Sequence, residues 1–243
     1  MNKGIFITGT DTGVGKTIVA ATLARILTLK GIKTGVMKPV TSGCITTDDG
    51  RKVSEDAELL KWAANSTDED ELCAPYVLNE PIAPAEAAAM EGVRINFGTI
   101  RGAFKVLSER NAFTIVEGAG GLMVPLAGGF LVSDLISQLE IPALVVARPN
   151  LGTINHTLLT TFAAKQLNID VRGTIIANFP EHPDTAAASA PHLMDTLSGV
   201  PILGIFNEVH AITPHEIVEK LAEQLLKERT TNILLREIGI DEV

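Results

Sequence analysis

A glycine-rich stretch near the start of the chain carries the residue types that bind phosphate. Residues Thr8–Thr17 are TGTDTGVGKT, which ends like the loop pattern G-x-x-x-x-G-K-[ST], although Thr10 occupies the place of its first glycine. Backbone N–H groups at a helix start hold phosphate oxygens. Lys16 would then reach the β- and γ-phosphates, and the Thr17 hydroxyl would hold Mg²⁺. The alternative is a glycine turn with a surface lysine, but the strand-like residues before it and the helical pattern after it favour the phosphate loop.

A second lysine could act on the same phosphates. Lys38 ends a strand-like run in the segment MKPVTSG. We expect this run to be the neighbouring strand, whose end lies beside the phosphate loop, so that Lys38 could neutralise charge on a transferring phosphoryl group. Ser42 and Gly43 offer a hydroxyl and a bare backbone close by. A solvated lysine at a strand end is the alternative, and the neighbouring phosphate loop favours the catalytic interpretation.

Two carboxylates could orient a metal ion. Glu117 ends the apolar run FTIV, as the metal-orienting acid does in phosphate-loop enzymes, and the glycines at 118, 120 and 121 would let the chain approach a ligand closely. Asp56 lies in an acidic stretch that is typical of a solvated face. Mg²⁺ nevertheless needs only one or two carboxylates besides phosphate oxygens and water, so Asp56 stays a candidate.

Two further segments follow strand-like runs. Asn178 ends TIIAN, where its amide could recognise an adenine edge or form a local turn, and the residues support both equally. The segment Pro149–His156 precedes a helical pattern, whose free N–H groups could bind a carboxylate; a simple helix start is the alternative. The five histidines are scattered without metal-ligand spacing, and we assign them no role.

Strand-like runs alternate with helical patterns along the whole chain, which predicts right-handed βαβ units. The sequence therefore predicts one α/β domain over residues 1–243, with a mostly parallel sheet covered by helices on both faces and ligands at the carboxyl ends of its strands. The predicted strands are Gly4–Thr8, Thr34–Lys38, Phe113–Glu117, Pro142–Ala147, Gly173–Asn178 and Pro201–Ile205. The predicted helices are Lys16–Lys30, Ala57–Ala64, Thr99–Arg110, Leu131–Leu139, Thr153–Leu167 and, as the last one, Pro214–Lys227. Thr41–Asp56 is predicted as a loop, and the tail from Glu228 to Val243 is not assigned.

Composition limits the function classes. Hydrophobic residues make up 46% of the chain and aromatics only 4%, which suits aliphatic strands buried on both faces. The net charge of −9 without a basic run argues against nucleic-acid binding. Two cysteines without framework or metal spacing are typical of a reducing cytoplasm. Because no apolar run approaches the roughly 20 residues of a membrane span and no signal peptide is evident, we expect a cytoplasmic protein without membrane contact.

Five motifs in order and spacing resemble the dethiobiotin synthetase family of P-loop NTPases, over Gly4 to about Phe206. The longer spacing from Gly9 to Gly15 is the form that this resemblance predicts. VEGAGG alone would not suffice, since related amidotransferase-type synthetases carry similar strings. The motifs are TGTDTGVGKT at Thr8–Thr17, KPVTSG at Lys38–Gly43, VEGAGG at Val116–Gly121, LGTINH at Leu151–His156 and AN at Ala177–Asn178.

The resemblance implies an ATP- and Mg²⁺-dependent ligase of biotin biosynthesis. Such an enzyme closes the ureido ring of dethiobiotin from 7,8-diaminopelargonate and CO₂, releasing ADP and phosphate. It does so through a carbamate and a carbamic-phosphoric anhydride. Family members are homodimers, with the substrate site at the subunit interface.

The resemblance also implies roles for individual residues. Lys16 and Lys38 would be catalytic, with Thr12 and Ser42 nearby, and Thr17, Asp56 and Glu117 would surround Mg²⁺. Nucleotide contacts would come from Gly13, Val14, Gly15, Lys16, Thr17, Ile18, Gly118, Ala119 and Gly120, and base contacts from Asn178, Ile205, Phe206 and Asn207. The diamine would be bound by Ser42 and by residues at a helix start, namely Leu151, Gly152, Thr153, Ile154 and Asn155. This helix start would reach the carboxylate of the diamine that is bound at the partner subunit.

The chain departs from the family pattern at three places. Gly13 stands where some members carry Glu, so no side chain acts there. The familiar segment P-x-x-P-H is PIAPA here, with Ala85 in place of His, which leaves the substrate contacts near Pro84–Ala87 open. Residues 205–207 lack the proline that members often use beside adenine, which leaves base selectivity open.

Three other function classes compete with this interpretation. Partition-type ATPases share the loop and fold, but their loop carries an extra lysine near the first glycine, whereas Thr10, Asp11 and Thr12 precede Gly13 here. A structural or interaction module would leave Lys16, Lys38 and Glu117 unexplained at one sheet edge. A cobyrinate-type amidation synthetase would need a glutaminase partner or domain, and no such domain fits in this chain.

Overall fold

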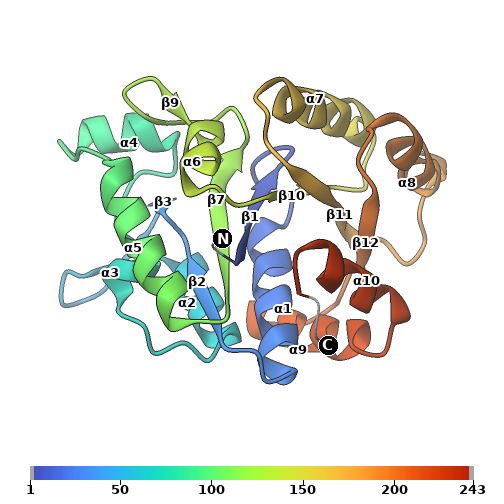
Figure 1. Ribbon diagram of the computed structural model, residues 1–243, viewed down its shortest axis with the longest axis horizontal. Helices are drawn as coiled ribbons and strands as arrows, with labels where there is room; N and C mark the ends of the chain where they lie inside the picture. The colour runs from blue at the N-terminus through green and yellow to red at the C-terminus, as the bar shows by residue number, and fades with distance from the viewer. Residues whose placement is uncertain (1–2, 241–243) are drawn as a thin grey trace.

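A six-stranded parallel sheet forms the centre of the molecule (Figure 1). The structure is a computed structural model that describes residues 3–240. The strand order is β12-β11-β10-β1-β7-β2, and every neighbouring pair is parallel. Because parallel strands all end at the same edge, the segments that follow them gather there. The strands are β1 Gly4–Gly9, β2 Thr34–Met37, β7 Phe113–Gly121, β10 Ala143–Ala147, β11 Val171–Phe179 and β12 Ile202–Asn207.

Helices cover both faces of the sheet. Alternate residues of β1 show the two sides: Ile5 and Ile7 pack in a core cluster with α1, whereas Phe6 packs with α5 and α6 in another. The first face is covered by α1 Lys16–Leu29, α2 Glu55–Ala63, α9 Pro214–Leu225 and α10 Arg229–Glu237, and the second by α5 Phe97–Arg110, α6 Val132–Leu139, α7 Thr153–Gln166 and α8 Thr185–Leu197. The predicted α/β class, with a mostly parallel sheet between helices, is confirmed.

The predicted loop Thr41–Asp56 was wrong, because this segment contains short elements. β3 Val40–Ser42 pairs with β6 Tyr76–Leu78, and β4 Ile45–Thr46 forms a hairpin with β5 Lys52–Val53. Runs of two or three residues are too short for an alternating pattern to be recognised. Helix α2 then begins at Glu55, since the Ser54 hydroxyl accepts the Ala57 N–H at 3.1 Å and caps it.

Several other elements lay outside the prediction. The structure adds α3 Asp70–Cys73, α4 Pro84–Met90, the hairpin of β8 Pro125–Ala127 and β9 Phe130–Leu131, and α8. Helix α9 is not the last one, because α10 forms within the unassigned tail and buries Leu234 and Leu235. Residues 241–243 of that tail lie outside the described residues. Strand β7 also continues four residues past Glu117, which is therefore not its last residue. Across residues 3–240, none of the helices combines the length and the apolar character needed to cross a bilayer.

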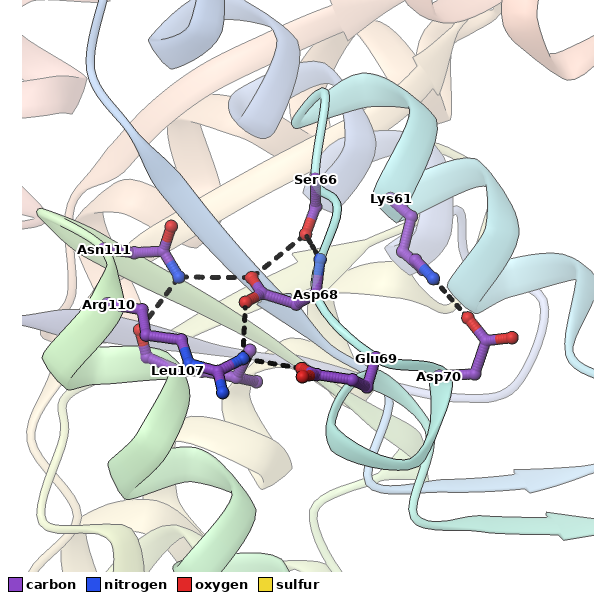
Figure 2. A network of polar contacts seen from close by, with 8 residues as sticks. All are labelled: Lys61, Ser66, Asp68, Glu69, Asp70, Leu107, Arg110 and Asn111. Carbon is purple, nitrogen blue, oxygen red and sulfur yellow. Dashed lines mark hydrogen bonds and ion pairs between the residues drawn. The ribbon is translucent and has the colours of Figure 1, made fainter.

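A polar network joins the segment after α2 to the end of α5 (Figure 2). Asp68 accepts hydrogen bonds from Ser66 at 3.1 Å and from Asn111 at 3.3 Å, and Arg110 bridges Asp68 and Glu69. Lys61 on α2 also pairs with Asp70. These contacts hold the far end of α2, whose first turn carries Asp56.

Candidate active site

The glycine-rich loop joins β1 to α1 at the carboxyl edge of the sheet. The Thr10 N–H donates to the Val146 carbonyl at 2.9 Å, which fixes the start of the loop against β10. Gly13 and Gly15 have φ angles of 72° and 97°, a left-handed conformation that favours glycine. The strand–loop–helix context that a phosphate loop requires is present.

Lys16 arches back over this loop and is only 6% exposed. Its Nζ donates to the Asp11 carbonyl at 2.9 Å. Burial lowers the pKa of Lys16 to about 8, and Lys38 adds to this effect, while Glu117 acts against it. The ammonium is thus held close to where phosphate oxygens would lie, in surroundings that an added anion would stabilise.

Lys38 approaches the loop across an intervening strand. The neighbour of β1 on this side is β7, not β2, so the expectation that Lys38 ends the adjacent strand was wrong. Met37 pairs with Val116 in the parallel register, which brings the next residues, Lys38 and Glu117, together. Lys38 Nζ lies 2.5 Å from Glu117 Oε1 and 2.7 Å from Asp56 Oδ2.

The two carboxylates keep Lys38 charged. Burial favours the neutral amine, but Glu117 and Asp56 together outweigh it, so the pKa of Lys38 is raised. Burial also opposes ionisation of Asp56, yet the contacts with Lys38 and Thr17 hold its pKa below the usual range. Burial raises the pKa of Glu117, an effect that Lys38 offsets only in part.

Thr17 completes a cluster of oxygen atoms. Its Oγ1 lies 2.8 Å from Glu117 Oε1 and 3.0 Å from Asp56 Oδ1, and its single hydrogen can serve only one of them at a time. Glu117 Oε2 is buried without any hydrogen-bond partner. The first turns of α1 and α2 and the middle of β7 supply the three residues.

This cluster has the chemistry of a magnesium site. Hard oxygen donors suit Mg²⁺, which takes one or two carboxylates together with substrate phosphates and water. Residues 3–240 hold no group of three or more His, Cys, Asp or Glu side chains arranged for a metal. The unpartnered Glu117 Oε2 is the acceptor that a bound cation would satisfy.

One cavity, which we term the loop cavity, contains most of the predicted phosphate and catalytic residues. Its volume is about 690 Å³. The sequence analysis did not predict the partly apolar wall of this cavity. The two prolines of the segment PIAP were the feature of the sequence that could have indicated it. The predicted residues that line it are Thr12, Gly13, Gly15, Lys16, Thr17, Ile18, Lys38, Ser42, Asp56, Glu117, Ala119 and Gly120, and the wall includes Val40, Pro81, Ile82, Pro84 and Val124.

A second cavity of about 400 Å³, which we term the asparagine cavity, lies on the other side of the loop. Asn150, Asn178 and Asn207 line it, together with Phe206 and with Val14 and other loop residues. Asn178 has a φ of 55°, a left-handed backbone conformation within β11, and it lines this cavity. Gly13, Gly15 and Ile18 line both cavities.

Two predicted nucleotide residues do not line either cavity. Ile205 is partly exposed on the opposite face of β12 from Phe206, because side chains alternate along a strand. Gly118 faces β1, where an added Cβ would lie 2.7 Å from the Phe6 ring. Gly118 thus serves strand packing in this structure.

The predicted diamine-binding segment lies apart from both cavities within one chain. Leu151 is 85% exposed, and Gly152 is the N-cap residue before α7, with a φ of 96°. Thr153 is buried with its hydroxyl unpartnered. None of the five residues from 151 to 155 lines the loop cavity or the asparagine cavity.

Solved structures show the fold class independently. The chain superposes on a ParA family ATPase from Chlorobium tepidum with a TM-score of 0.59 at 12% identity, covering 98% of both chains. It superposes on the MinC:MinD cell division protein complex of Aquifex aeolicus with a TM-score of 0.58 at 13% identity, covering 97% of this chain and 94% of that one. At such low identities the likeness concerns the fold alone.

Sequence comparisons are more specific. An AAA domain family model matches residues 3–216. The ATP-dependent dethiobiotin synthetase BioD of Bacillus licheniformis is 41% identical over 215 residues, covering 88% of this chain and 90% of that protein. The protein of the same name from Thermodesulfovibrio yellowstonii is 40% identical, covering 90% of this chain and 94% of that protein. The one from Bacillus subtilis (strain 168) is 33% identical, covering 98% of this chain and 100% of that protein. With such identities over nearly the whole length of each protein, the chain belongs to the ATP-dependent dethiobiotin synthetase family.

Proposed function

We propose that this chain closes the ureido ring of dethiobiotin by ATP-dependent carboxylation of 7,8-diaminopelargonate. One observation carries the proposal: Lys16, Lys38, Thr17, Asp56 and Glu117 meet in a single cavity at the carboxyl edge of the sheet. Two buried lysines beside a magnesium-type oxygen cluster suit phosphoryl transfer, where catalysis rests on positioning and charge stabilisation. Family membership supplies the substrate class.

The reaction proceeds in three steps. One amine nitrogen attacks CO₂ and loses a proton, which gives a carbamate. A carbamate oxygen attacks the γ-phosphorus of ATP, and ADP leaves, giving a carbamic-phosphoric anhydride. The second amine attacks the anhydride carbon, loses a proton and expels phosphate, which closes the ring. ATP thus converts a poor leaving oxygen into phosphate.

The chain's residues act on charge and position in these steps. Lys16 and Lys38 neutralise the phosphoryl group as it moves from ADP to the carbamate. Thr12 and Ser42 line the same cavity with hydroxyl groups that can hold the carbamate. The apolar wall near Pro81, Ile82 and Val124 suits the alkyl chain of the diamine and limits the access of water to the anhydride.

The oxygen cluster would hold the metal ion. Thr17, Asp56 and Glu117 supply one hydroxyl and two carboxylates, a donor set that fits Mg²⁺. When bound, Mg²⁺ supplies charge neutralisation on the β- and γ-phosphates. Lys38 would share Glu117 and Asp56 with such an ion, since its ammonium pairs with both carboxylates.

The nucleotide would span both cavities. Gly13, Gly15 and Ile18 belong to both linings, so phosphates in the loop cavity and a base in the asparagine cavity fit one extended ligand. Asn178 and Asn207 offer amides to the base edge, and Phe206 supports them from the core.

A second copy of the chain would complete the diamine site. Leu151, Leu159 and Phe162 are 85%, 59% and 63% exposed along the start and the outer side of α7, an apolar surface of the kind that a partner covers. The N-terminus of α7 could then present its N–H groups and Asn155 to the diamine carboxylate bound in the partner's loop cavity. We accordingly propose a cytoplasmic homodimer of single-domain chains.

Phosphate release distinguishes this function from that of a nucleotide switch. With ATP and Mg²⁺ present, we expect release only when both the diamine and CO₂ are added, with one phosphate for each ring formed. A partition-type ATPase would release phosphate without the diamine. Release that does not depend on the diamine would contradict the proposal.

Oxygen labelling tests the anhydride. A carbamate oxygen that attacks phosphorus stays with the phosphate when the ring closes. Brief incubation with C¹⁸O₂ should therefore deliver one labelled oxygen to each released phosphate. The incubation must be brief because CO₂ exchanges its oxygen atoms with water. Unlabelled phosphate accompanied by labelled dethiobiotin would exclude this route.

A further inference from the structure

Arg148 is a partly buried cation with no role in the scheme above. It follows β10, which lies between β1 and β11 in the sheet (Figure 1). Its side chain therefore leaves the carboxyl edge between the glycine-rich loop after β1 and Asn178 on β11. Arg148 lines the asparagine cavity together with Gly13 and Gly15 of the loop and with Asn178.

The guanidinium has few partners inside the protein. Its Nε is buried without a hydrogen bond, and its Nη2 lies 3.5 Å from His156 Nδ1. Since a guanidinium can only donate, that imidazole nitrogen must accept. Within residues 3–240, no carboxylate forms an ion pair with Arg148. A buried charged donor without acceptors is costly, and a ligand rich in acceptors would remove this cost.

Charge in the asparagine cavity points to the part of the ligand that Arg148 meets. Among the described residues that line this cavity, Arg148 is the only ionisable one, and the rest are amides, glycines and apolar side chains. The asparagines suit a neutral ring that donates and accepts hydrogen bonds, whereas the guanidinium suits an anionic oxygen. A planar fork of N–H groups binds phosphate more specifically than a lysine does.

We propose that Arg148 binds a phosphate oxygen of the nucleotide, between the loop that holds the terminal phosphates and the asparagines that contact the base. This inference rests on the proposed nucleotide site. His156, on the second turn of α7, steadies one end of the guanidinium. Arg148 therefore determines affinity for the phosphorylated form of the ligand and does not contact the base.

Nucleotide affinity measured without any turnover tests this assignment. Binding of ADP and of adenosine to the full chain is measured by calorimetry, or by competition against a fluorescent ADP. Arg148→Gln should weaken ADP binding by about tenfold to a hundredfold, the range for a lost charged hydrogen bond, while adenosine affinity changes less than about threefold. Arg148→Lys keeps the charge but loses the planar fork of N–H groups, so it should reduce ADP affinity less than Arg148→Gln does. It also tests the assignment if the Gln variant does not fold.

Arg172 offers a matched control. It lies at the start of β11, its side chain is 44% exposed, and it pairs with Asp170 at 3.0 Å. Arg172→Gln should leave both affinities unchanged. Unchanged ADP binding in Arg148→Gln, or an equal loss for ADP and adenosine, would overturn the assignment. ADP binding that depends on Arg148 in a chain that makes no dethiobiotin would instead contradict the proposed reaction and support this inference.

Discussion

Lys38 Nζ lies 2.5 Å from Glu117 Oε1, in a pair buried on both sides. The contact exists because β2 and β7 are parallel neighbours in register, so the residues after Met37 and Val116 meet at the carboxyl edge. Asp56 approaches the same ammonium at 2.7 Å. The lysine thus occupies the centre of the oxygen cluster where we propose that Mg²⁺ binds.

Replacing Lys38 should separate catalysis from nucleotide binding. In Lys38→Ala, the moving phosphoryl group loses one neutralising charge, so turnover should fall by about a hundredfold to a thousandfold. ATP affinity should change far less, because the loop and Lys16 remain. Steady-state rates and ATP binding of the folded variant check this. Exposed Lys33 provides the control variant Lys33→Ala, and equal turnover in Lys38→Ala would remove Lys38 from the mechanism.

Nucleotide binding should depend on the protonation of Lys16. Its pKa in the free protein is lowered to about 8 by burial, and only the charged form attracts phosphate. Above that pH, binding requires uptake of a proton, so ADP affinity should fall by up to about tenfold per pH unit. Binding measured from about pH 6 to 9 should therefore bend near the Lys16 pKa. Lys16→Arg stays charged throughout, and the same bend in that variant would assign it to another group.

Glu117 should set the requirement for magnesium. Glu117→Gln keeps the shape but removes the charge, so the Mg²⁺ concentration for half-maximal turnover should rise by about tenfold or more. Titration with Mg²⁺ after removal of metal by a chelator measures it. Glu55→Gln, on the exposed side of the first turn of α2, is the matched control. An unchanged magnesium requirement in Glu117→Gln would place the ion elsewhere.

Two inactive variants should restore each other if α7 serves the partner's site. Lys38→Ala and Asn155→Ala each impair every site in their own dimers. A mixed dimer has one site with wild-type Lys38 from one chain and wild-type Asn155 from the other. Co-refolding in equal amounts should therefore recover about a quarter of wild-type activity by random pairing. Activity no greater than that of the separate variants would show that Asn155 does not act across an interface.

Asp68 should contribute to stability through the network in Figure 2. Its side chain is only 12% exposed and accepts bonds from Ser66, Arg110 and Asn111. Asp68→Ala removes the acceptor of the Ser66 hydroxyl and one acceptor each of Arg110 and Asn111, which keep Glu69 and Leu107. The free energy of unfolding should therefore fall by about 1–2 kcal/mol. Urea denaturation measures this loss. As a control, Asp49→Ala removes an exposed ion pair with Arg51 and should leave the midpoint of urea denaturation unchanged. An equal loss of stability in Asp49→Ala would show a general effect of removing acidic residues.

Local patterns predicted the loop and the strand ends well, but not the contacts that depend on strand order. Lys16 and Thr17 follow from a contiguous motif, and Lys38 and Glu117 follow from their places after apolar runs. That these last two residues touch depends on β7 lying between β1 and β2, which no local pattern reveals. Asp56 looked like part of a solvated acidic face, and only the family resemblance selected it.

The misses have physical reasons as well. Ile205 was carried over from the family, but side-chain alternation along β12 turns it away from the asparagine cavity. Arg148 follows the apolar run PALVVA, so the rule that selected Lys38 at a strand end would have selected it too. The short hairpin β4–β5 lacked the length that such patterns need. Helix α10, in contrast, carries Thr231, Leu234 and Leu235 on one buried face, a helical spacing that was present in the unassigned tail.

Incorporation of labelled CO₂ tests the central claim most directly. The folded chain is incubated with ATP, Mg²⁺, 7,8-diaminopelargonate and ¹⁴CO₂, then acidified so that free CO₂ and carbamate are lost. Our account predicts acid-stable label in dethiobiotin, one carbon for each ADP formed, and none when ATP or Mg²⁺ is omitted. Folded protein that binds ATP but leaves no acid-stable label would contradict it.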